Sequence, residues 1–395
     1  MEPTSAVRTR VDGRAFAAVT FTIVVLLASS NLPTPLYPTY ERIFSLSPLD
    51  VTLVYSTYAG AVIVSLVLFG RLSDTVGRRR VLLPAVSLAI VAATVFAFAP
   101  SAAWLVVAQV VEGIALGMLQ GSAVPALLET EPHGDAHRAS LVGSSATVAG
   151  AAVGPALAGV LAQYAGAPRR LVFVVEIVLL AIGLVLLLRL FPKDHGVGRW
   201  RPQRPRVPAS IRRTFVFAGA TAFTGWALAS LFLSLVPSYM IELLGETNLA
   251  LIGGVAALML ACSAIVQPAT GHLGPRRAEL LGLGLVVAAA VALLTAAELH
   301  SLAALVGSGA LAGCGLGCAF RGSLVDVTAV APEHERANVV AAFYIVIYLA
   351  TALPVIGVGL LALSSGLLPA VRTFAWIIGM AALAVFVLMS RMERR

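Results

Sequence analysis

Two carboxylates lie within long apolar stretches of the sequence, where an isolated charge is unfavourable. Glu112 stands in the apolar run 102–128 and Glu176 in the run 171–190. A carboxylate at such a depth must be paired, hydrated or protonated. Both residues are therefore candidates for proton coupling. The alternative for Glu112 is a structural hydrogen bond to a neighbouring helix. For Glu176 it is a pair with a nearby arginine or a position at the lip of the membrane.

Neutral polar side chains accompany Glu112 along the same run. At about 100° per residue, Gln109, Glu112 and Gln120 share one face of a helix. In an earlier run, Asn31 precedes three prolines that break the end of that helix. Asn31, Gln109 and Gln120 are candidates for lining a cavity and contacting a substrate. Hydrogen bonds between helices are the alternative.

A second pair of charges lies towards the end of the run 302–330. Arg321 and Asp326 are five positions apart, which places them about 140° apart around a helix. They are therefore not expected to pair with each other. A structural or gating role and contact with a substrate are both open, because charges within a membrane span are usually functional.

The elements that position these residues follow from the composition. Of 395 residues, 59% are hydrophobic and only 12% are charged, whereas a soluble domain has about 25% charged residues. The mean hydropathy is +0.94. These values exclude a soluble enzyme, a disordered scaffold and a coiled coil. Twelve runs are long enough to cross a bilayer as helices, at 15–37, 51–69, 81–99, 102–128, 139–164, 171–190, 214–239, 250–270, 280–297, 302–330, 337–363 and 371–389.

The basic residues predict the orientation of these spans. Of the 27 lysines and arginines, 22 fall before, after or between the runs on one side, four fall on the other, and Arg321 lies within a span. Positive charge marks the cytoplasmic side. The sequence therefore predicts a multi-pass protein of the cell (inner) membrane with both termini in the cytoplasm. The basic, proline-rich segment 191–213 becomes a cytoplasmic linker between residues 1–190 and residues 214–395.

The two halves resemble copies of one unit. Pro132 and Pro332 are 200 positions apart, and Pro155 and Pro354 are 199 positions apart. A nearly constant shift indicates a parallel repeat. The predicted fold is all-α, with twelve transmembrane helices in two pseudo-symmetric six-helix bundles around a central cavity.

Two short strings carry further information. Between the second and third runs, a turn contains Gly70, Asp74 and Gly77, followed by Arg78 and Arg79. The glycines permit a tight turn, and the carboxylate suits an arginine partner. In the fifth run, small residues suited to close helix contact surround a proline that bends the helix, namely Gly150, Gly154, Pro155 and Gly159.

The first string resembles the signature between helices two and three of the major facilitator superfamily. The resemblance implies alternating access by a monomer, with Asp74 and its arginines latching the cytoplasmic ends of the two halves in the outward-open state. Thr75 departs from the signature, in which a cation is usual. The second string is similar to the motif of proton-coupled antiporters, with Ala158 in place of one glycine. Gln109 stands where the family usually has an arginine.

We therefore predict a secondary transporter, driven by protons and exporting small, rather apolar compounds. A nutrient symporter or uniporter of the same fold is the alternative within transport, and a non-transporting receptor or scaffold is the alternative outside it. The sequence has no Walker loop and no hydrolase or kinase motif, so no enzyme, cofactor or nucleic-acid partner is expected. Cys314 and Cys318 lack the further ligands of a metal site. The expected partners are a small-molecule substrate, protons and lipid.

Overall fold

The computed structural model describes residues 13–70, 72–192, 202 and 205–393. Within these ranges the first half of the chain is built from α1 (Gly13–Ser29), η1 (Thr34–Leu36), α2 (Tyr37–Phe44), α3 (Pro48–Phe69), α4 (Leu72–Val76), α5 (Arg79–Phe98), α6 (Ala102–Thr130), α7 (Ala136–Tyr164) and α8 (Pro168–Leu190). The second half comprises η2 (Ala209–Ile211), α9 (Arg212–Ser234), α10 (Val236–Leu244), α11 (Leu249–Ala269), α12 (Pro275–Leu299), α13 (Leu302–Val330), α14 (Arg336–Ser365) and α15 (Leu367–Glu393).

The described residues contain twelve helical segments that are long and apolar enough to cross a membrane. This confirms the predicted number of spans and the all-α fold class. Part of the predicted linker, residues 193–201 and 203–204, lies outside the described residues. The exact boundaries of the two halves therefore stay a prediction.

The first span of each half departs from the single helix that was expected. The chain leaves α1 after Ser29, passes through η1 and resumes as α2, which begins beside Pro38. In the second half, α9 ends at Ser234 and α10 starts with Pro237 in its first turn. Proline has no backbone N–H to donate, so it is accommodated at the start of a helix but interrupts its interior. The prolines thus divide both spans near the same end of the molecule.

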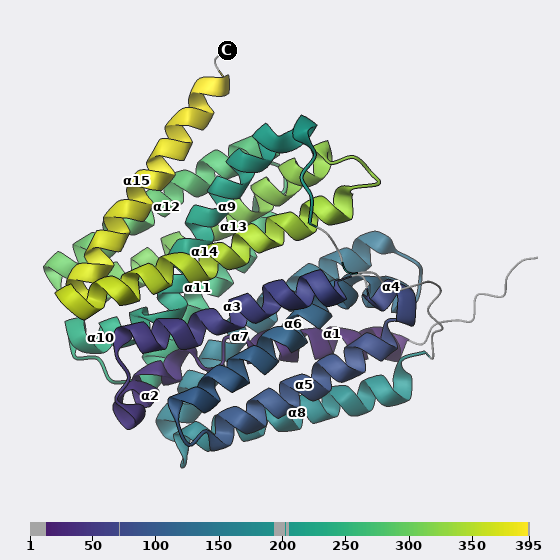
Figure 1. The fold of residues 1–395 in the computed structure, drawn as a ribbon, viewed down its shortest axis with the longest axis horizontal. Helices are drawn as coiled ribbons and strands as arrows, with labels where there is room; N and C mark the ends of the chain where they lie inside the picture. The colour runs from purple at the N-terminus through teal and green to yellow at the C-terminus, as the bar shows by residue number, and fades with distance from the viewer. Residues whose placement is uncertain (1–12, 71, 193–201, 203–204, 394–395) are drawn as a thin grey trace, which may run out of the picture.

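Figure 1 shows the two bundles side by side, one formed by α1–α8 and the other by α9–α15. In the first bundle, α3 packs on α6, α1 on α7 and α5 on α8. In the second bundle, the corresponding pairs are α11 with α13, α9 with α14 and α12 with α15. The same pairings recur in both bundles, as expected for two copies of one unit.

The bundles meet chiefly through α7 with α11 and α3 with α14. We call the end that carries α2 and α10 the hairpin end, and the end that carries α4 the linker end (Figure 1). At the hairpin end, the Ser238 hydroxyl donates to the Glu41 carboxylate over 2.7 Å, and the Leu249 amide donates to Gln163 Oε1 over 2.8 Å. Direct hydrogen bonds therefore join the two bundles at this end.

Candidate functional site

The two predicted proton-binding residues are brought together in the first bundle. Glu112 on α6 and Glu176 on α8 are only 2% and 3% exposed. The Ser29 hydroxyl, at the last residue of α1, donates to Glu176 Oε1 and also adjoins Glu112. The carboxyl groups of Glu112 and Glu176 are close enough to interact electrostatically. Three helices thus place two carboxyl groups and one hydroxyl in a single buried cluster.

This cluster cannot hold two negative charges at low cost. Two carboxylates that share a buried site repel each other, so ionisation of both is strongly disfavoured. Among the described residues, Glu112 Oε1 has no hydrogen-bond partner, and a buried charge without such a partner is unfavourable. The arrangement can therefore bind a proton and share it across Ser29.

Close helix packing fixes the position of Ser29. A Cβ atom on Gly154 of α7 would lie 2.2 Å from the Ala28 carbonyl oxygen, and one on Gly150 would lie 2.3 Å from the Val24 carbonyl oxygen. Only glycine allows α7 to approach the backbone of α1 this closely. On the opposite side of α1, Gly183 of α8 faces the Thr22 hydroxyl. The end of α1 is thus held between α7 and α8.

The two glutamines of α6 belong to a separate group of tyrosines. Gln109 donates to the Tyr37 hydroxyl over 3.1 Å, and Gln120 donates to the Tyr348 hydroxyl. Between them, ring contacts run from Tyr37 to Tyr55 (centroids 6.3 Å apart), to Tyr58 (5.5 Å) and to Tyr348 (6.3 Å). This tyrosine chain crosses from the first bundle to α14 of the second.

Asn31 and Arg321 form hydrogen bonds with groups outside the carboxyl cluster. The Asn31 amide donates to the Ser30 hydroxyl over 3.1 Å. Arg321 donates to the carbonyl oxygens of Thr270 and Gly271, over 3.0 and 2.9 Å, and so fastens α13 to the end of α11. As expected from their spacing, neither of these bonds joins Arg321 to Asp326. A role for these residues in binding substrate stays a prediction.

The gating string forms a compact turn at the linker end. Arg78 pairs with Asp74, and its Nε donates to Glu129 Oε1 over 3.1 Å. Arg79 donates to the carbonyl oxygens of Leu188 and Phe191. Gly77 has φ = 100°, a conformation that favours glycine. These contacts lie within the first bundle, so the latch between bundles that the resemblance implies stays a prediction.

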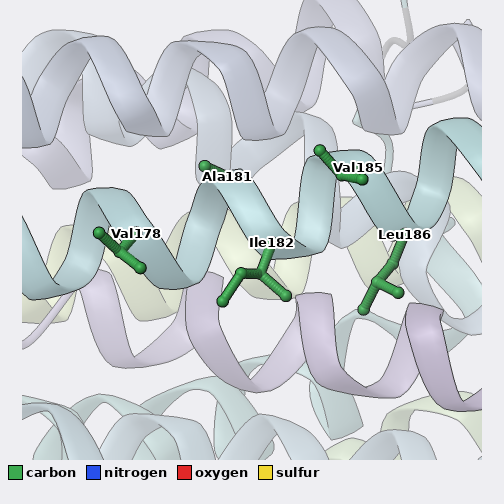
Figure 2. Close-up of a pocket in the computed structure, with 5 residues that line it drawn as sticks. All are labelled: Val178, Ala181, Ile182, Val185 and Leu186. Atoms are coloured by element: carbon green, nitrogen blue, oxygen red, sulfur yellow. The ribbon is translucent and has the colours of Figure 1, made fainter.

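Two hollows in the described part of the chain can be compared with the predicted central cavity. One, of about 350 Å³, lies on α8 and is lined only by apolar side chains of that helix, as Figure 2 shows for Val178, Ile182 and Val185. These side chains are exposed on the surface of a predicted span, so this hollow faces lipid. The other, of about 430 Å³, lies at the hairpin end and is lined by residues of both bundles, Glu41 and Ser238 among them. Neither hollow is the predicted central cavity, which stays a prediction.

Sequence reasoning missed Ser29 and the tyrosine chain. Ser29 is an ordinary small residue of a span, and only the packing of α1 between two helices reveals its position. Tyr55 and Tyr58 did carry a signal, because residues three positions apart share one face of a helix. Their partners Tyr37 and Tyr348 come from distant parts of the sequence and carried none.

The comparison with known proteins identifies the fold. A model of the Major Facilitator Superfamily matches residues 19–355. The chain belongs to the Major Facilitator Superfamily. The match extends over both bundles and confirms the resemblance drawn from the sequence.

Solved structures of transporters share this fold. A bacterial homologue of the human lysosomal transporter Spinster, in an inward-facing and unoccupied conformation, has a TM-score of 0.76 at 16% identity, with 98% of each chain covered. The peptide transporter POT, solved as a mutant, has a TM-score of 0.79 at 15% identity, with 99% of this chain and 97% of that chain covered. At these identities the likeness concerns the fold. The family and the shared fold indicate a transporter.

One relative has a stated substrate. Over 149 residues, the chain is 29% identical to the tetracenomycin C resistance and export protein of Streptomyces glaucescens. The alignment covers 38% of this chain and 28% of that protein. The matched region is therefore less than a third of the relative's length.

Proposed function

We propose that this transporter exchanges protons for small, rather apolar compounds and exports them from the cell. The observation that carries the proposal is the cluster of Glu112, Ser29 and Glu176. A proton-driven transporter needs a buried group that changes its protonation when access changes sides. The buried carboxyl pair meets this requirement. Burial favours the state in which the pair retains one proton, and entry of water allows the pair to release it.

The direction of access follows from the basic residues. Most of the arginines lie at the linker end or in the adjoining segments, which makes the linker end cytoplasmic by the positive-inside rule. Both termini are then cytoplasmic, and the protein lies in the inner membrane. Because Glu41–Ser238 and Gln163–Leu249 join the bundles at the hairpin end, we assign the structure to an inward-facing state.

The class of substrate is inferred from the tyrosine chain, and the direction of transport from the relative. Tyr37, Tyr55, Tyr58 and Tyr348 present aromatic rings between the bundles, and aromatic rings bind apolar and aromatic compounds. The partly matching relative is a tetracenomycin C resistance and export protein, which favours export as the direction of transport. An uptake symporter of the same fold remains the alternative, and the direction of proton-driven flux distinguishes the two.

The test uses proteoliposomes that contain the full chain and are loaded with a panel of fluorescent lipophilic dyes, such as ethidium and rhodamine. A pH gradient should drive dye movement against the proton flux, and dissipating the gradient should stop it. Glu112→Gln should abolish the dependence on the gradient. Glu333→Gln, at an exposed position between α13 and α14, is the matched control and should behave as wild type. Gradient-driven flux in Glu112→Gln equal to that of wild type would exclude Glu112 from coupling.

A further inference from the structure

A further buried carboxyl group lies in the other bundle and is not used by the proposed mechanism. Glu279 stands in the first turns of α12, about 6 Å along the helix from Pro275 at 1.5 Å per residue. It is 0% exposed. Among the described residues, neither carboxyl oxygen has a hydrogen-bond partner. Its nearest cation is Arg276, whose Nη1 lies 3.8 Å from Glu279 Oε2.

The neighbouring helix α13 presents two more oxygen-bearing side chains to this carboxyl group. Ser323 adjoins Glu279 and is itself fully buried, with a hydroxyl that has no partner among the described residues. Asp326, one turn further along α13, is half-buried and interacts electrostatically with Glu279. Gly322 makes room for the group, since a Cβ atom there would lie 2.9 Å from Glu279 Cγ. Asp326 is therefore the more exposed of the two carboxyl groups and lies one turn nearer than Ser323 to the linker end of α13.

In the first bundle, the positions that correspond to Glu279 and its neighbours are occupied by apolar residues. Four buried positions of α12 match four buried positions of α5 exactly 197 residues earlier, so that Ala278, Glu279, Gly282 and Leu283 correspond to Val81, Leu82, Ala85 and Val86. Helix α13 begins and ends 200 residues after α6 begins and ends, so the two helices have the same length. At that spacing, Ser323 and Asp326 correspond to Ala123 and Ala126, both buried. The fold therefore packs well without polar groups at these positions.

The surroundings favour a proton over a metal cation as the ligand. Arg276 already places a positive charge beside Glu279, and its Nη2 is held by the Met389 carbonyl oxygen of α15 over 2.9 Å. A second cation would meet like-charge repulsion there. A buried carboxyl group without hydrogen bonds is most easily accommodated with a proton bound. On α9, the Thr221 hydroxyl donates to the Met389 sulfur and is neutral.

We propose that Glu279 is a second proton-binding site, which exchanges its proton with the linker-end solution through Asp326. In release, the O–H bond of the Glu279 carboxyl group breaks and the proton passes to the Asp326 carboxylate, which delivers it to water. Uptake is the reverse. Arg276 then stabilises the Glu279 carboxylate that is left behind. The site is separate from the Glu112–Glu176 cluster and does not depend on the proposed substrate or on the direction of transport.

The experiment follows protonated carboxyl groups in the full chain, reconstituted in lipid nanodiscs, by infrared difference spectroscopy between acidic and basic pH. Glu279→Gln should remove one protonated-carboxyl component, whereas Glu112→Gln should remove a different one. Glu279→Leu copies Leu82 of the first bundle and should also lose the component while remaining folded, as checked by thermal unfolding. The acidic sample is kept above the ordinary pKa of glutamate, so that an exposed carboxyl group stays ionised at both pH values and Glu333→Gln is the control with an unchanged spectrum. Asp326→Asn should slow deuterium exchange of the Glu279 carboxyl group roughly 100-fold, the lower end of the effect of a positioned proton acceptor.

The outcomes separate this site from the proposed function. A complete set of carboxyl components in folded Glu279→Gln and Glu279→Leu would overturn the site, whatever Glu112→Gln shows. An unchanged exchange rate in Asp326→Asn would overturn the relay. Replacing potassium chloride with sodium chloride should leave the Glu279 component unchanged, and its loss in sodium would show a metal-cation site in place of a proton site.

Discussion

Gln120 of α6 and Tyr348 of α14 are hydrogen-bonded to each other across the two bundles. Gln120 lies about 15 Å from the linker end of α6, at 1.5 Å per residue. The bond therefore joins the bundles well inside the membrane, far from the contacts at the hairpin end. It ties the polar face of α6 to the half of the molecule that must move relative to it.

Removing this bond should shift the balance between conformations. We expect Tyr348→Phe to weaken the interaction between the bundles by about 1 kcal/mol, the usual net contribution of one hydrogen bond. The alternative conformation should then be populated severalfold more. Distances between fluorescent labels at the linker ends of α6 and α13 would measure this population. Tyr344→Phe, one turn earlier on α14, is the matched control. A label distance distribution identical to that of wild type in Tyr348→Phe would contradict the prediction.

Ser29 offers a test of the carboxyl cluster that leaves both acids in place. Ser29→Ala removes the hydroxyl that donates to Glu176, and a buried polar group that loses its partner costs about 1–3 kcal/mol. We expect lower thermal stability together with slower proton-driven flux. Ser30→Ala, which removes only local bonds, one to the Leu27 carbonyl oxygen and one from the Asn31 amide, should have a small effect on both. Equal effects of the two substitutions would mean that Ser29 does not link the acids.

Two adjacent glycines of α11 test the contact between bundles. A Cβ atom on Gly253 would lie 2.3 Å from the Pro155 carbonyl oxygen of α7, whereas a Cβ atom on Gly254 meets nothing within 4 Å. Gly253→Ala should destabilise the packed hairpin end by about 1–3 kcal/mol, as for overpacking in a core. Gly254→Ala should be neutral or slightly stabilising, because alanine favours a helix more than glycine does. Accessibility of a cysteine placed at Ser238 would report the opening, which should be greater in Gly253→Ala.

The turn between α6 and α7 should make stability depend on pH. Desolvation raises the pKa of Glu131, but hydrogen bonds from the backbone amides of Asp135 and His133 outweigh it and hold the pKa below its usual value. The Arg138 and His137 amides likewise lower the pKa of Asp135. A lowered pKa in the folded state means that the carboxylates stabilise the turn above their ordinary pKa, and that this stabilisation is lost as pH falls through the folded value.

Thermal unfolding between neutral and acidic pH would measure that loss. At neutral pH, Glu131→Gln should melt below wild type, since the amide accepts the same backbone donors more weakly than a carboxylate does. The difference between the two proteins should shrink as pH falls below the ordinary range of glutamate. A difference that is constant over the whole range would show that the charge of Glu131 does not stabilise the turn.

The number of spans could be read from the sequence because lipid imposes it. A helix that crosses a bilayer needs about 20 apolar residues, and every such run in the chain is helical in the structure, although the first run of each half is divided. The division of the first span into α1, η1 and α2 was also partly visible in its prolines. The continuation of the chain as α2 beyond Tyr37 was not visible in the sequence, because Glu41 and Arg42 lower the hydropathy there. In the structure, the Glu41 carboxylate accepts a hydrogen bond from Ser238 of the other bundle.

The pairing of acids was beyond the reach of sequence patterns. Glu112 and Glu176 could each be singled out by their apolar surroundings, but they lie on different helices, and their meeting depends on how α1 is held between α7 and α8. Glu279 escaped notice for a different reason. It stands beside Arg276 and Arg277, so the hydropathy pattern predicts an apolar run that begins only at Leu280, whereas α12 begins at Pro275.

Helix α7 touches both moving parts of the molecule through bare backbone. Gly150 and Gly154 rest on α1, and Gly159 rests on Leu249 of α11 in the other bundle. Helix surfaces made of backbone alone have no interdigitated side chains, so they can rotate against each other. Helix α7 can therefore serve as the axis about which one bundle tilts relative to the other. Gly154 presses on Ala28, the residue before Ser29. A tilt of α7 therefore displaces Ser29, which bridges Glu112 and Glu176. The movement of the bundles and the protonation of the two acids are thus coupled through the same contact.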